Sequence, residues 1–157
     1  TMVNTKVYDA IVSGSGTYKG GYTYSGHAVA CAAAIAVQHI LRGPGFLDNV
    51  KKTGNLLSNQ LNERFGQHDI RGRGMLMTLE LVEDRKTKTP FGASQALSAK
   101  IYQNAQARGL ITHALSGTVD GFVGDHVVVC PPLIATGDNI DTIVGLLGDS
   151  IDAAIQE

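Results

Sequence analysis

Apolar residues recur at helical spacing in the stretch from residue 46 to residue 65. The residues on one side of this stretch are Val50, Gly54, Leu57, Leu61 and Phe65. The residues between them are mostly polar and include lysines and asparagines, as in a helix with one face packed and the other in water. The pattern therefore predicts an amphipathic helix over residues 46–65.

Strand-like patterns follow this helix. Between residues 75 and 82, alternate residues are apolar, which predicts a strand with one drier face. The segments 110–115 and 126–130 are also rich in apolar residues and predict two further strands. Pro131 and Pro132 must end the last strand, because neither proline can donate a backbone hydrogen bond to a neighbouring strand.

Two more helices complete this region. Residues 93–108 predict a helix closed by Gly109. Its inward residues are Leu97, Ile101 and Ala105. The last helix is predicted to begin at Asp138 as its N-cap, and its apolar stripe consists of Ile140, Ile143, Val144, Leu147, Ile151 and Ile155. The order helix, strand, helix, strand, strand, helix predicts a two-layer α+β unit, with an antiparallel or mixed sheet covered by helices on one side.

The first 45 residues follow a different pattern. A short apolar stretch over residues 7–12 is followed by residues 13–21, where four glycines in nine positions predict a loop. A helix is then predicted from residue 25 or 26 to about residue 41, and Gly43-Pro44-Gly45 ends it. Its many alanines permit close packing on more than one side and favour a buried position.

The composition is that of a nearly neutral chain with little charge. The 157 residues include 13 Lys and Arg and 14 Asp and Glu, a net charge of −1, so nucleic acid and membranes are not favoured as partners. Charged residues make up 17% of the chain, against about 25% in an average protein. Together with 19 glycines, this predicts a domain with a large buried or interface surface. The longest apolar run, residues 28–37, is too short to cross a membrane.

The two cysteines indicate a reducing compartment. Cys31 and Cys130 are far apart in the sequence and have apolar neighbours, which favours packed, reduced thiols over a disulfide framework. The sequence also opens without the basic and apolar pattern of a secretory signal. The expected location is the cytoplasm.

Several familiar site motifs are absent or incomplete. A dinucleotide-binding loop would need a glycine at the position of Lys19, and no phosphate-binding loop of the nucleotide hydrolases is present. His27 and Cys31 stand four residues apart without a third ligand nearby, so they are interpreted as packed core residues and no metal site is predicted. None of the single histidines beside apolar segments identifies a general base. These are His39, His113 and His126.

The segment from Gly21 to His27 carries the most suggestive chemistry. It places the hydroxyls of Thr23 and Ser25 in a glycine-containing turn before a helix. Such a turn offers side-chain donors, backbone N–H groups and the positive end of the helix dipole to an anion such as a phosphate. The same residues also suit simple helix capping. Both interpretations remain open on these residues alone.

Four segments together resemble one enzyme family. They are VYDAI at residues 7–11 with GYTYSGHAVACAAA at 21–34, RGRGML at 71–76 with EL at 80–81, RGLI at 108–111, and GDHVVVCPPLI at 124–134. In this order they resemble the class III (omega) aminotransferases, which depend on pyridoxal phosphate, and the resemblance covers essentially the whole chain. It implies an α/β fold, the C-terminal part of a fold-type I transferase. Most of the chain would be the α+β small domain, with a short, mostly antiparallel sheet covered by helices.

The resemblance also implies roles for parts of the chain. Residues 1–45 correspond to the end of the large cofactor domain, and residues 46–157 correspond to the small domain. Thr23 matches a threonine that hydrogen-bonds the cofactor phosphate of the neighbouring subunit across a homodimer interface, and Tyr22 beside it is assigned to cofactor binding. The family's cofactor lysine, which forms a Schiff base, lies upstream of the matching segment. Lys19 is not its counterpart, so no catalytic residue is assigned within this chain.

The implied reaction moves an amino group from an amine or amino acid to a keto acid or aldehyde in a ping-pong sequence. The isolated chain is expected to be inactive. His113 is assigned to substrate binding, because it stands where many members carry an arginine that holds a substrate carboxylate. A histidine cannot make that two-pronged contact. Residues 116–124 form a longer loop than usual and can bring substrate contacts of their own, and Ala28 replaces a proline that often follows Gly-His.

Two other functions fit the same residues. An aminomutase or racemase of the same family would share Thr23 and differ in how it handles the substrate. A non-catalytic α+β module would instead bind a partner through the apolar helix at residues 28–37. Such a module predicts a well-behaved monomer, whereas part of an aminotransferase predicts self-association or poor solubility.

Overall fold

The computed structural model describes residues 2–156, and the chain divides into two compact units. The first unit is Thr1–Gly43 and the second is Pro44–Glu157. The division falls close to residues 45 and 46, where the sequence predicts the boundary between two domains.

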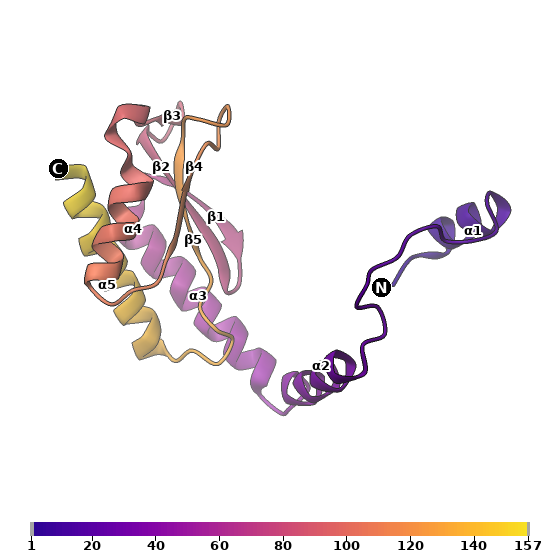
Figure 1. Cartoon of the computed structure of the whole chain (residues 1–157). Helices are drawn as coiled ribbons and strands as arrows, with labels where there is room; N and C mark the ends of the chain where they lie inside the picture. The colour runs from indigo at the N-terminus through magenta and orange to yellow at the C-terminus, as the bar shows by residue number, and fades with distance from the viewer. Residues whose placement is uncertain (1, 157) are drawn as a thin grey trace. The chain divides into compact units, whose positions relative to one another are not determined.

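The second unit contains a five-stranded antiparallel sheet with helices on one face (Figure 1). Its helices are α3 (Phe46–Phe65), α4 (Leu97–Ala107) and α5 (Gly137–Gln156). Its strands are β1 (Asp69–Arg73), β2 (Leu76–Asp84), β3 (Thr89–Pro90), β4 (His113–Ser116) and β5 (Asp125–Val129). The strands lie in the order β1-β2-β5-β4, and β3 pairs with the end of β2. This arrangement confirms the predicted fold class, an α/β fold with a short antiparallel sheet covered by helices.

The core of the second unit lies between the sheet and the helices, as the hydrophobic pattern predicts. Helix α3 has the predicted bounds. In β2 the inward residues Met77, Leu79 and Leu81 are buried, and Leu76 on the other face is 56% exposed. The alternation is lost further along the strand, because Glu80 and Val82 of that other face are buried as well. Each large apolar side chain buried in this way contributes roughly 1.5–3 kcal/mol. The predicted inward residues that are buried here are Gly54, Leu57, Leu61, Phe65, Met75, Met77, Leu79, Leu81, Leu97, Ile101, Ala105, Ile140, Val144, Leu147 and Ile151.

Strand β1 is an element that the sequence pattern did not predict. Its residues are mostly charged or glycine, so it lacks the apolar alternation of an ordinary strand. Gly72 allows it to approach β2 closely, because a Cβ there would lie 2.3 Å from the carbonyl oxygen of Leu76 and its φ is 142°. Helix α3 approaches the following turn through Gly54, where a Cβ would lie 2.8 Å from the backbone of Gly74.

Helix α5 begins at Gly137, before the predicted cap. The amide of Asn139 donates to the hydroxyl of Thr136 at 3.3 Å, and the Asn139 side chain accepts from the Thr136 amide at 3.0 Å. This reciprocal pair makes Thr136 the N-cap. The prediction of Asp138 as the cap is therefore wrong. Asp138 lies instead in the first turn, where its charge favours the positive end of the helix.

Helix α4 begins at Leu97, after a 3₁₀ turn over Ala93–Gln95, and not at residue 93 as predicted. The residue before it, Ala96, has a φ of 48° and no side chain that caps a helix. The buried carboxylate of Asp125, at the start of β5, accepts a hydrogen bond from the Ser98 amide at 3.1 Å. The sheet thereby supplies the cap that the helix sequence lacks.

The first unit contains two helices, α1 (Thr5–Ser13) and α2 (Ala28–Leu41). The short apolar stretch at residues 7–12, for which no structure was predicted, lies within α1. Helix α2 starts at Ala28 rather than at residue 25 or 26. No described residue of either helix is buried within the chain. The sequence predicted that α2 is buried, but no described residue of this chain covers it.

Two side-chain predictions are corrected by this exposure. His27 and Cys31 are not packed core residues within the chain, because both are exposed. Cys130 is exposed as well, just beyond the end of β5, and both cysteines are free. Apolar neighbours in the sequence suggested burial, but a side chain is buried only where a second element packs against it.

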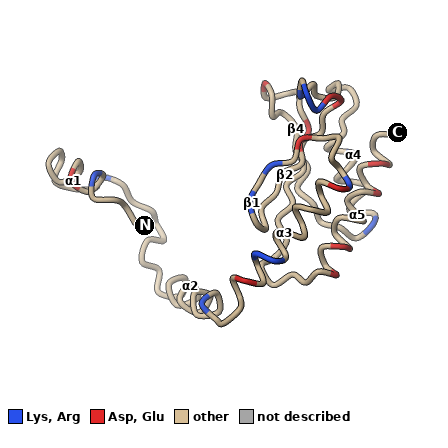
Figure 2. Tube along the Cα trace, turned by 180° about the vertical axis from the view of Figure 1, so that it is seen from behind, with Lys and Arg blue, Asp and Glu red and all other residues tan. Residues whose placement is uncertain are grey.

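Charged residues of both signs are interspersed over the second unit, whereas α2 carries none (Figure 2). Over residues 2–156, no single helix is both long enough and apolar enough to cross a membrane. Helices α2 and α3 pass that test only when their residues are counted together, by length and composition alone. The described residues contain no group of three or more His, Cys, Asp or Glu side chains placed to hold a metal ion.

Candidate functional site

The segment predicted to contact a phosphate forms a turn that leads into α2. The amide of Ser25 donates to the carbonyl oxygen of Tyr22 at 2.8 Å, and the amide of His27 donates to that of Tyr24 at 3.1 Å. Gly26 has a φ of 73°, a conformation that glycine adopts without strain. The turn therefore presents its side chains at the N-terminal end of α2.

His27 is the residue that caps α2. Its Nδ1 accepts a hydrogen bond from the amide of Ala30 at 3.2 Å. The hydroxyls of Thr23 and Ser25 take no part in the cap, and neither makes a hydrogen bond to any residue in the described part of the chain. Helix capping, one of the two interpretations of this segment, is thus accounted for without either hydroxyl.

Thr23, the predicted phosphate ligand, is exposed in this turn. In the first turn of α2, the amides of Ala28 and Val29 have no acceptor within the helix. The end of the helix also carries a partial positive charge. These donors fit an anionic group such as a phosphate. The role of Thr23 itself remains a prediction.

Tyr22, the second predicted cofactor contact, belongs to an exposed group of rings. The centroid of its ring lies 6.0 Å from that of Tyr24, which in turn lies 6.1 Å from that of His27 in an edge-to-face arrangement. The Tyr22 side chain is 73% exposed, so its ring is open to a further partner. Lys19 is exposed between α1 and α2, and the sequence does not match it to the cofactor lysine.

His113, the predicted substrate contact, is the first residue of β4 and belongs to the second unit. It pairs with Val128 and lies on the sheet face away from the helices, which we call the open face. Its ring is exposed and makes no hydrogen bond within residues 2–156. From the strand registers, the open face carries Asp69, Arg71, Arg73, Leu76, Thr78, Glu80, His113, Leu115, His126 and Val128.

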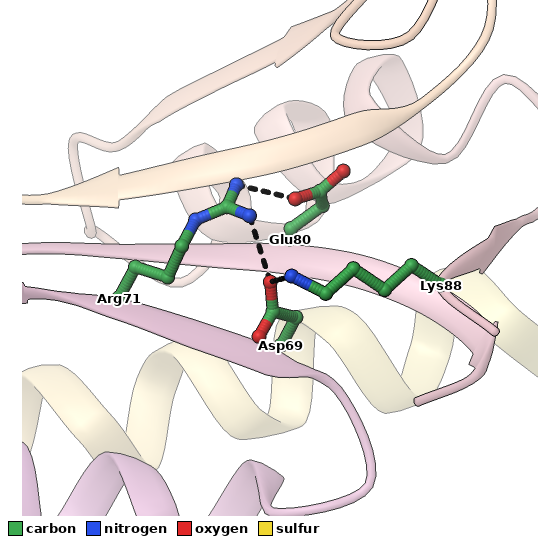
Figure 3. A network of polar contacts seen from close by, with 4 residues as sticks. All are labelled: Asp69, Arg71, Glu80 and Lys88. Carbon is green, nitrogen blue, oxygen red and sulfur yellow. Dashed lines mark hydrogen bonds and ion pairs between the residues drawn. The ribbon is translucent and has the colours of Figure 1, made fainter. Parts of the chain in front are cut away.

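An ion-pair network lies on the open face (Figure 3). One nitrogen of the Arg71 guanidinium lies 2.8 Å from a carboxylate oxygen of Asp69, and another contacts Glu80. The ammonium of Lys88 lies 2.9 Å from the same oxygen of Asp69. The side chains of Asp69 and Glu80 are only 15% and 11% exposed. Two cations therefore balance two poorly solvated carboxylates, and the network carries no net charge.

Arg71 lies within one of the family motifs, but the sequence did not predict this network. The available signal was the charged residue at every second position, 69, 71 and 73, which places three charges on one face of a strand. Glycines at positions 72 and 74 obscured that signal, because glycine is unfavourable inside a strand. The pairing with Glu80 depends on the register of β1 with β2, which no local pattern supplies.

Three hollows adjoin one another around the end of β5. One, of about 160 Å³, lies beside Leu110, Ile111 and α5. A second, of about 460 Å³, lies between Arg73 and the segment after β5, and a third, of about 380 Å³, lies beside Arg71 and Thr78. The first and second share Cys130, Pro131 and Pro132, and the second and third share Arg73 and Leu76.

A buried histidine lies between α3 and β2. Nδ1 of His68 is 3.0 Å from the carbonyl oxygen of Val82, and the ring centroid is 6.2 Å from that of Phe91. The side chain is 3% exposed, and its Nε2 has no hydrogen-bond partner among the described residues. Burial disfavours the charged ring and lowers the pKa of His68, and the contact with Val82 offsets part of this effect.

The predicted loop over residues 116–124 is a tight hairpin between β4 and β5. The carboxylate of Asp120 accepts hydrogen bonds from the amides of Val123 and Phe122 at 2.8 and 2.9 Å. These two bonds lower the pKa of Asp120. Phe122 is 82% exposed at the tip. Contacts of this loop with a substrate remain a prediction.

Comparison with known proteins identifies the family. A family model described as Aminotransferase class-III matches residues 1–151. The chain belongs to the class III aminotransferases. The resemblance carried by the four sequence segments is thereby confirmed.

Individual aminotransferases are similar over nearly the whole chain. An aminotransferase of Gibberella zeae is 35% identical over 159 residues, which cover 98% of this chain and 31% of the relative. A transaminase structure from directed evolution by ancestral reconstruction has a TM-score of 0.80 and 33% identity, covering 98% of this chain and 34% of that one. An amine transaminase from an uncultivated Pseudomonas species, with pyridoxal phosphate bound, has a TM-score of 0.75 and 31% identity, covering 96% and 34%. The chain therefore spans about a third of the length of these proteins.

Proposed function

We propose that the complete protein is a pyridoxal-phosphate-dependent aminotransferase that moves an amino group from an amine or amino acid to a keto acid or aldehyde. In this proposal the chain supplies two parts of the enzyme. Thr23, with Tyr22, contacts the phosphate of the cofactor bound by the neighbouring subunit. Residues 46–157 form the small domain. The lysine that holds the cofactor belongs to the part of the relatives' length that this chain does not cover.

The observation that carries the proposal is the arrangement of donors at the start of α2. His27 caps the helix, so the exposed hydroxyl of Thr23 stays available. The amides of Ala28 and Val29 and the positive end of the helix lie in the same place. Family members bind pyridoxal phosphate, and its phosphate is the kind of anion that these donors suit.

The chain's own residues would bind and orient rather than react. When bound, pyridoxal phosphate supplies the reactive aldehyde and the electron-withdrawing ring that amino-group transfer needs. Thr23 donates its hydroxyl hydrogen to a phosphate oxygen, which holds the cofactor in one orientation. His113 offers one ring nitrogen to a substrate group, whereas an arginine at that position would offer a two-pronged donor.

We also propose that the complete protein is a homodimer. Val29, Ile35 and Ile40 of α2 are 72%, 59% and 61% exposed within the chain, and an apolar surface of this kind is normally covered. The rest of the protein and a second subunit would cover it. Sedimentation velocity of the complete protein should show a dimer. A stable monomer would contradict a phosphate contact made between subunits.

The test of the phosphate contact uses two variants of the complete protein, Thr23→Ala and Thr23→Ser. Loss of the hydroxyl should weaken pyridoxal phosphate binding about tenfold, because a hydrogen bond to a charged group contributes about 1.5 kcal/mol. The serine variant keeps the donor and should stay within about twofold of wild type. Equilibrium dialysis measures both, with Thr142→Ala, an exposed hydroxyl of α5, as the matched control. Unchanged binding in Thr23→Ala would exclude the assigned contact.

The isolated chain provides a second test. Added pyridoxal phosphate should give no absorbance band that depends on a lysine of this chain, because none matches the cofactor lysine. A band that disappears when one of its own lysines is replaced would overturn the assignment.

For the complete protein, amino transfer to a separate keto acid distinguishes a transaminase from an aminomutase or racemase, since those two need no second substrate.

A further inference from the structure

Two arginines of β1 on the open face have different surroundings. Arg71 is held between Asp69 and Glu80, so its charge is balanced within the chain (Figure 3). Arg73 lies two residues further along the same strand and on the same face. It is exposed and makes no hydrogen bond or ion pair with any described residue. The charge of Arg73 is therefore available to a ligand.

Arg73 lines two of the adjoining hollows. The larger, of about 460 Å³, is lined by Arg73, Met75, Leu76, Cys130, Pro131, Pro132 and Leu133. The smaller, of about 380 Å³, is lined by Arg71, Gly72, Arg73, Leu76 and Thr78. No acidic residue lines either hollow. Leu76 and Leu133 are 56% and 41% exposed, so apolar surface lies beside the free guanidinium.

We propose that the larger hollow binds an aliphatic monocarboxylate, with its carboxylate on Arg73 and its chain on Leu76 and Leu133. A guanidinium matches the geometry of a carboxylate with two parallel hydrogen bonds. The apolar chain of the ligand would cover Leu76 and Leu133, and removing this apolar surface from water favours binding. A dicarboxylate does not fit the charges, because Arg71, the other cation that lines the adjoining hollow, is already paired with two acids.

This site is distinct from the predicted substrate contact and does not depend on the proposed function. Arg73 lies on β1 and His113 on β4, at opposite ends of the strand order β1-β2-β5-β4. The lining residues all belong to the second unit. Binding there needs no cofactor and no residue of the first unit, so it is measurable on this chain even where transaminase activity is not.

Cys130 provides the readout, because it is an exposed thiol in the lining of the same hollow. Hexanoate at about 20 mM should slow alkylation of Cys130 by N-ethylmaleimide about threefold, as expected for a Kd of about 10 mM. Peptide mass spectrometry follows the rate. Cys31 is exposed in the first unit and should react at an unchanged rate, which makes it the internal control. Hexanamide has nearly the same shape without the charge and should protect little.

Variants of Arg73 separate the charge from the apolar contact. Arg73→Gln should abolish protection by hexanoate, and Arg73→Lys should retain part of it. Arg108→Gln changes an exposed arginine at the end of α4 and should leave protection intact. Circular dichroism checks that each variant is folded.

Three results would overturn the proposal. The first is a lack of protection of Cys130 by hexanoate in the wild-type chain. The second is equal protection by hexanamide, or in Arg73→Gln, because the carboxylate would then play no part. The third is protection that grows with protein concentration when no hexanoate is present, which would assign Arg73 to a carboxylate of a second copy of the chain.

Discussion

Helices α5 and α2 are both rich in apolar residues, yet only α5 is covered within the chain. Helix α5 buries Ile140, Leu147 and Ile151 and packs against α3 and α4. Helix α2 has no charged residue and buries none of its side chains (Figure 2). The difference lies in what surrounds each helix, because the second unit wraps a sheet and helices around one core while the first has no second layer. Apolar composition shows that a helix needs covering, but not which element covers it.

The comparison predicts that the second unit and α2 contribute unequally to the free energy of unfolding. The second unit should unfold cooperatively, because its helices and strands share one cluster of buried residues. Helix α2 keeps its shape through the high helix propensity of alanine, which gives only marginal stability to a helix of 14 residues. Equivalent substitutions in the two units should therefore have unequal effects.

The largest contrast is expected for a pair of isoleucines. Ile101 in α4 is completely buried, and Ile35 in α2 is 59% exposed. Ile101→Ala should lower the free energy of unfolding by about 3–4 kcal/mol, because it removes buried methyl groups and leaves a cavity. Ile35→Ala should change it by less than about 0.5 kcal/mol. Urea denaturation measures both. Equal losses would show that α2 is packed within the chain after all.

A pair of glycines should give the next largest difference. Gly72→Ala places a Cβ 2.3 Å from the carbonyl oxygen of Leu76 at a φ of 142°. The loss expected from strain and displacement of the strand is about 2–3 kcal/mol. Gly21 has open space around its Cβ position, so Gly21→Ala should be neutral or slightly stabilising. A wild-type midpoint for Gly72→Ala in urea would contradict the close approach of β1 to β2.

The two helix caps should differ by a smaller amount. Asp125→Ala removes the buried carboxylate that accepts from the Ser98 amide, and about 1–2 kcal/mol of unfolding free energy should be lost. His27→Ala removes the cap of α2, which should reduce helical circular dichroism slightly and leave the main unfolding transition in place. If His27→Ala shifts the transition as far as Asp125→Ala does, the two units do not unfold independently.

The smallest effect concerns the pH dependence of stability. The pKa of His68 is lowered in the folded chain, so the unfolded chain binds a proton at pH values where the folded chain does not. Stability should therefore fall as the pH drops through the unfolded value of about 6.5 towards the lowered folded value. His68→Gln should flatten this decline, whatever its effect at neutral pH.

The control for that measurement is His39→Gln, in an exposed position of α2. Urea midpoints of the wild type and both variants at several pH values between about 5 and 8 are compared. The control should keep the wild-type slope. An unchanged slope in His68→Gln would mean that His68 is not the source of the pH dependence.

Much of the second unit was predictable because its pattern is local. The bounds of α3 and the inward residues of β2 and α4 follow from which positions are apolar, and burial then confirms them. The start of α5 was misplaced by the same kind of reasoning, because Thr136 and Asn139 cap it as a pair and a single acidic residue seemed sufficient. Strand β1 was missed because its stability depends on a close approach to β2 at Gly72 rather than on its own apolar residues.

In the candidate site, only the residues that match family motifs could be predicted from the sequence. Thr23 and His113 were chosen by resemblance, and the structure adds that His27, not Thr23, caps α2. Arg73 lies in the RGRGML motif, and the sequence assigned it no role. Arg71 differs from Arg73 because it has two acidic neighbours: Asp69 on its own strand and Glu80 on β2.

The sequence alone determined the family, the helices and strands with regular apolar periods, and the low charge of the chain. Each of these depends on residue types and on spacings within a few turns or strand positions. Tertiary structure decided which arginine is paired, which histidine is buried, and which apolar helix has no packing partner among the described residues. These properties depend on contacts between residues distant in the sequence, and pairing energies and desolvation are set by those contacts.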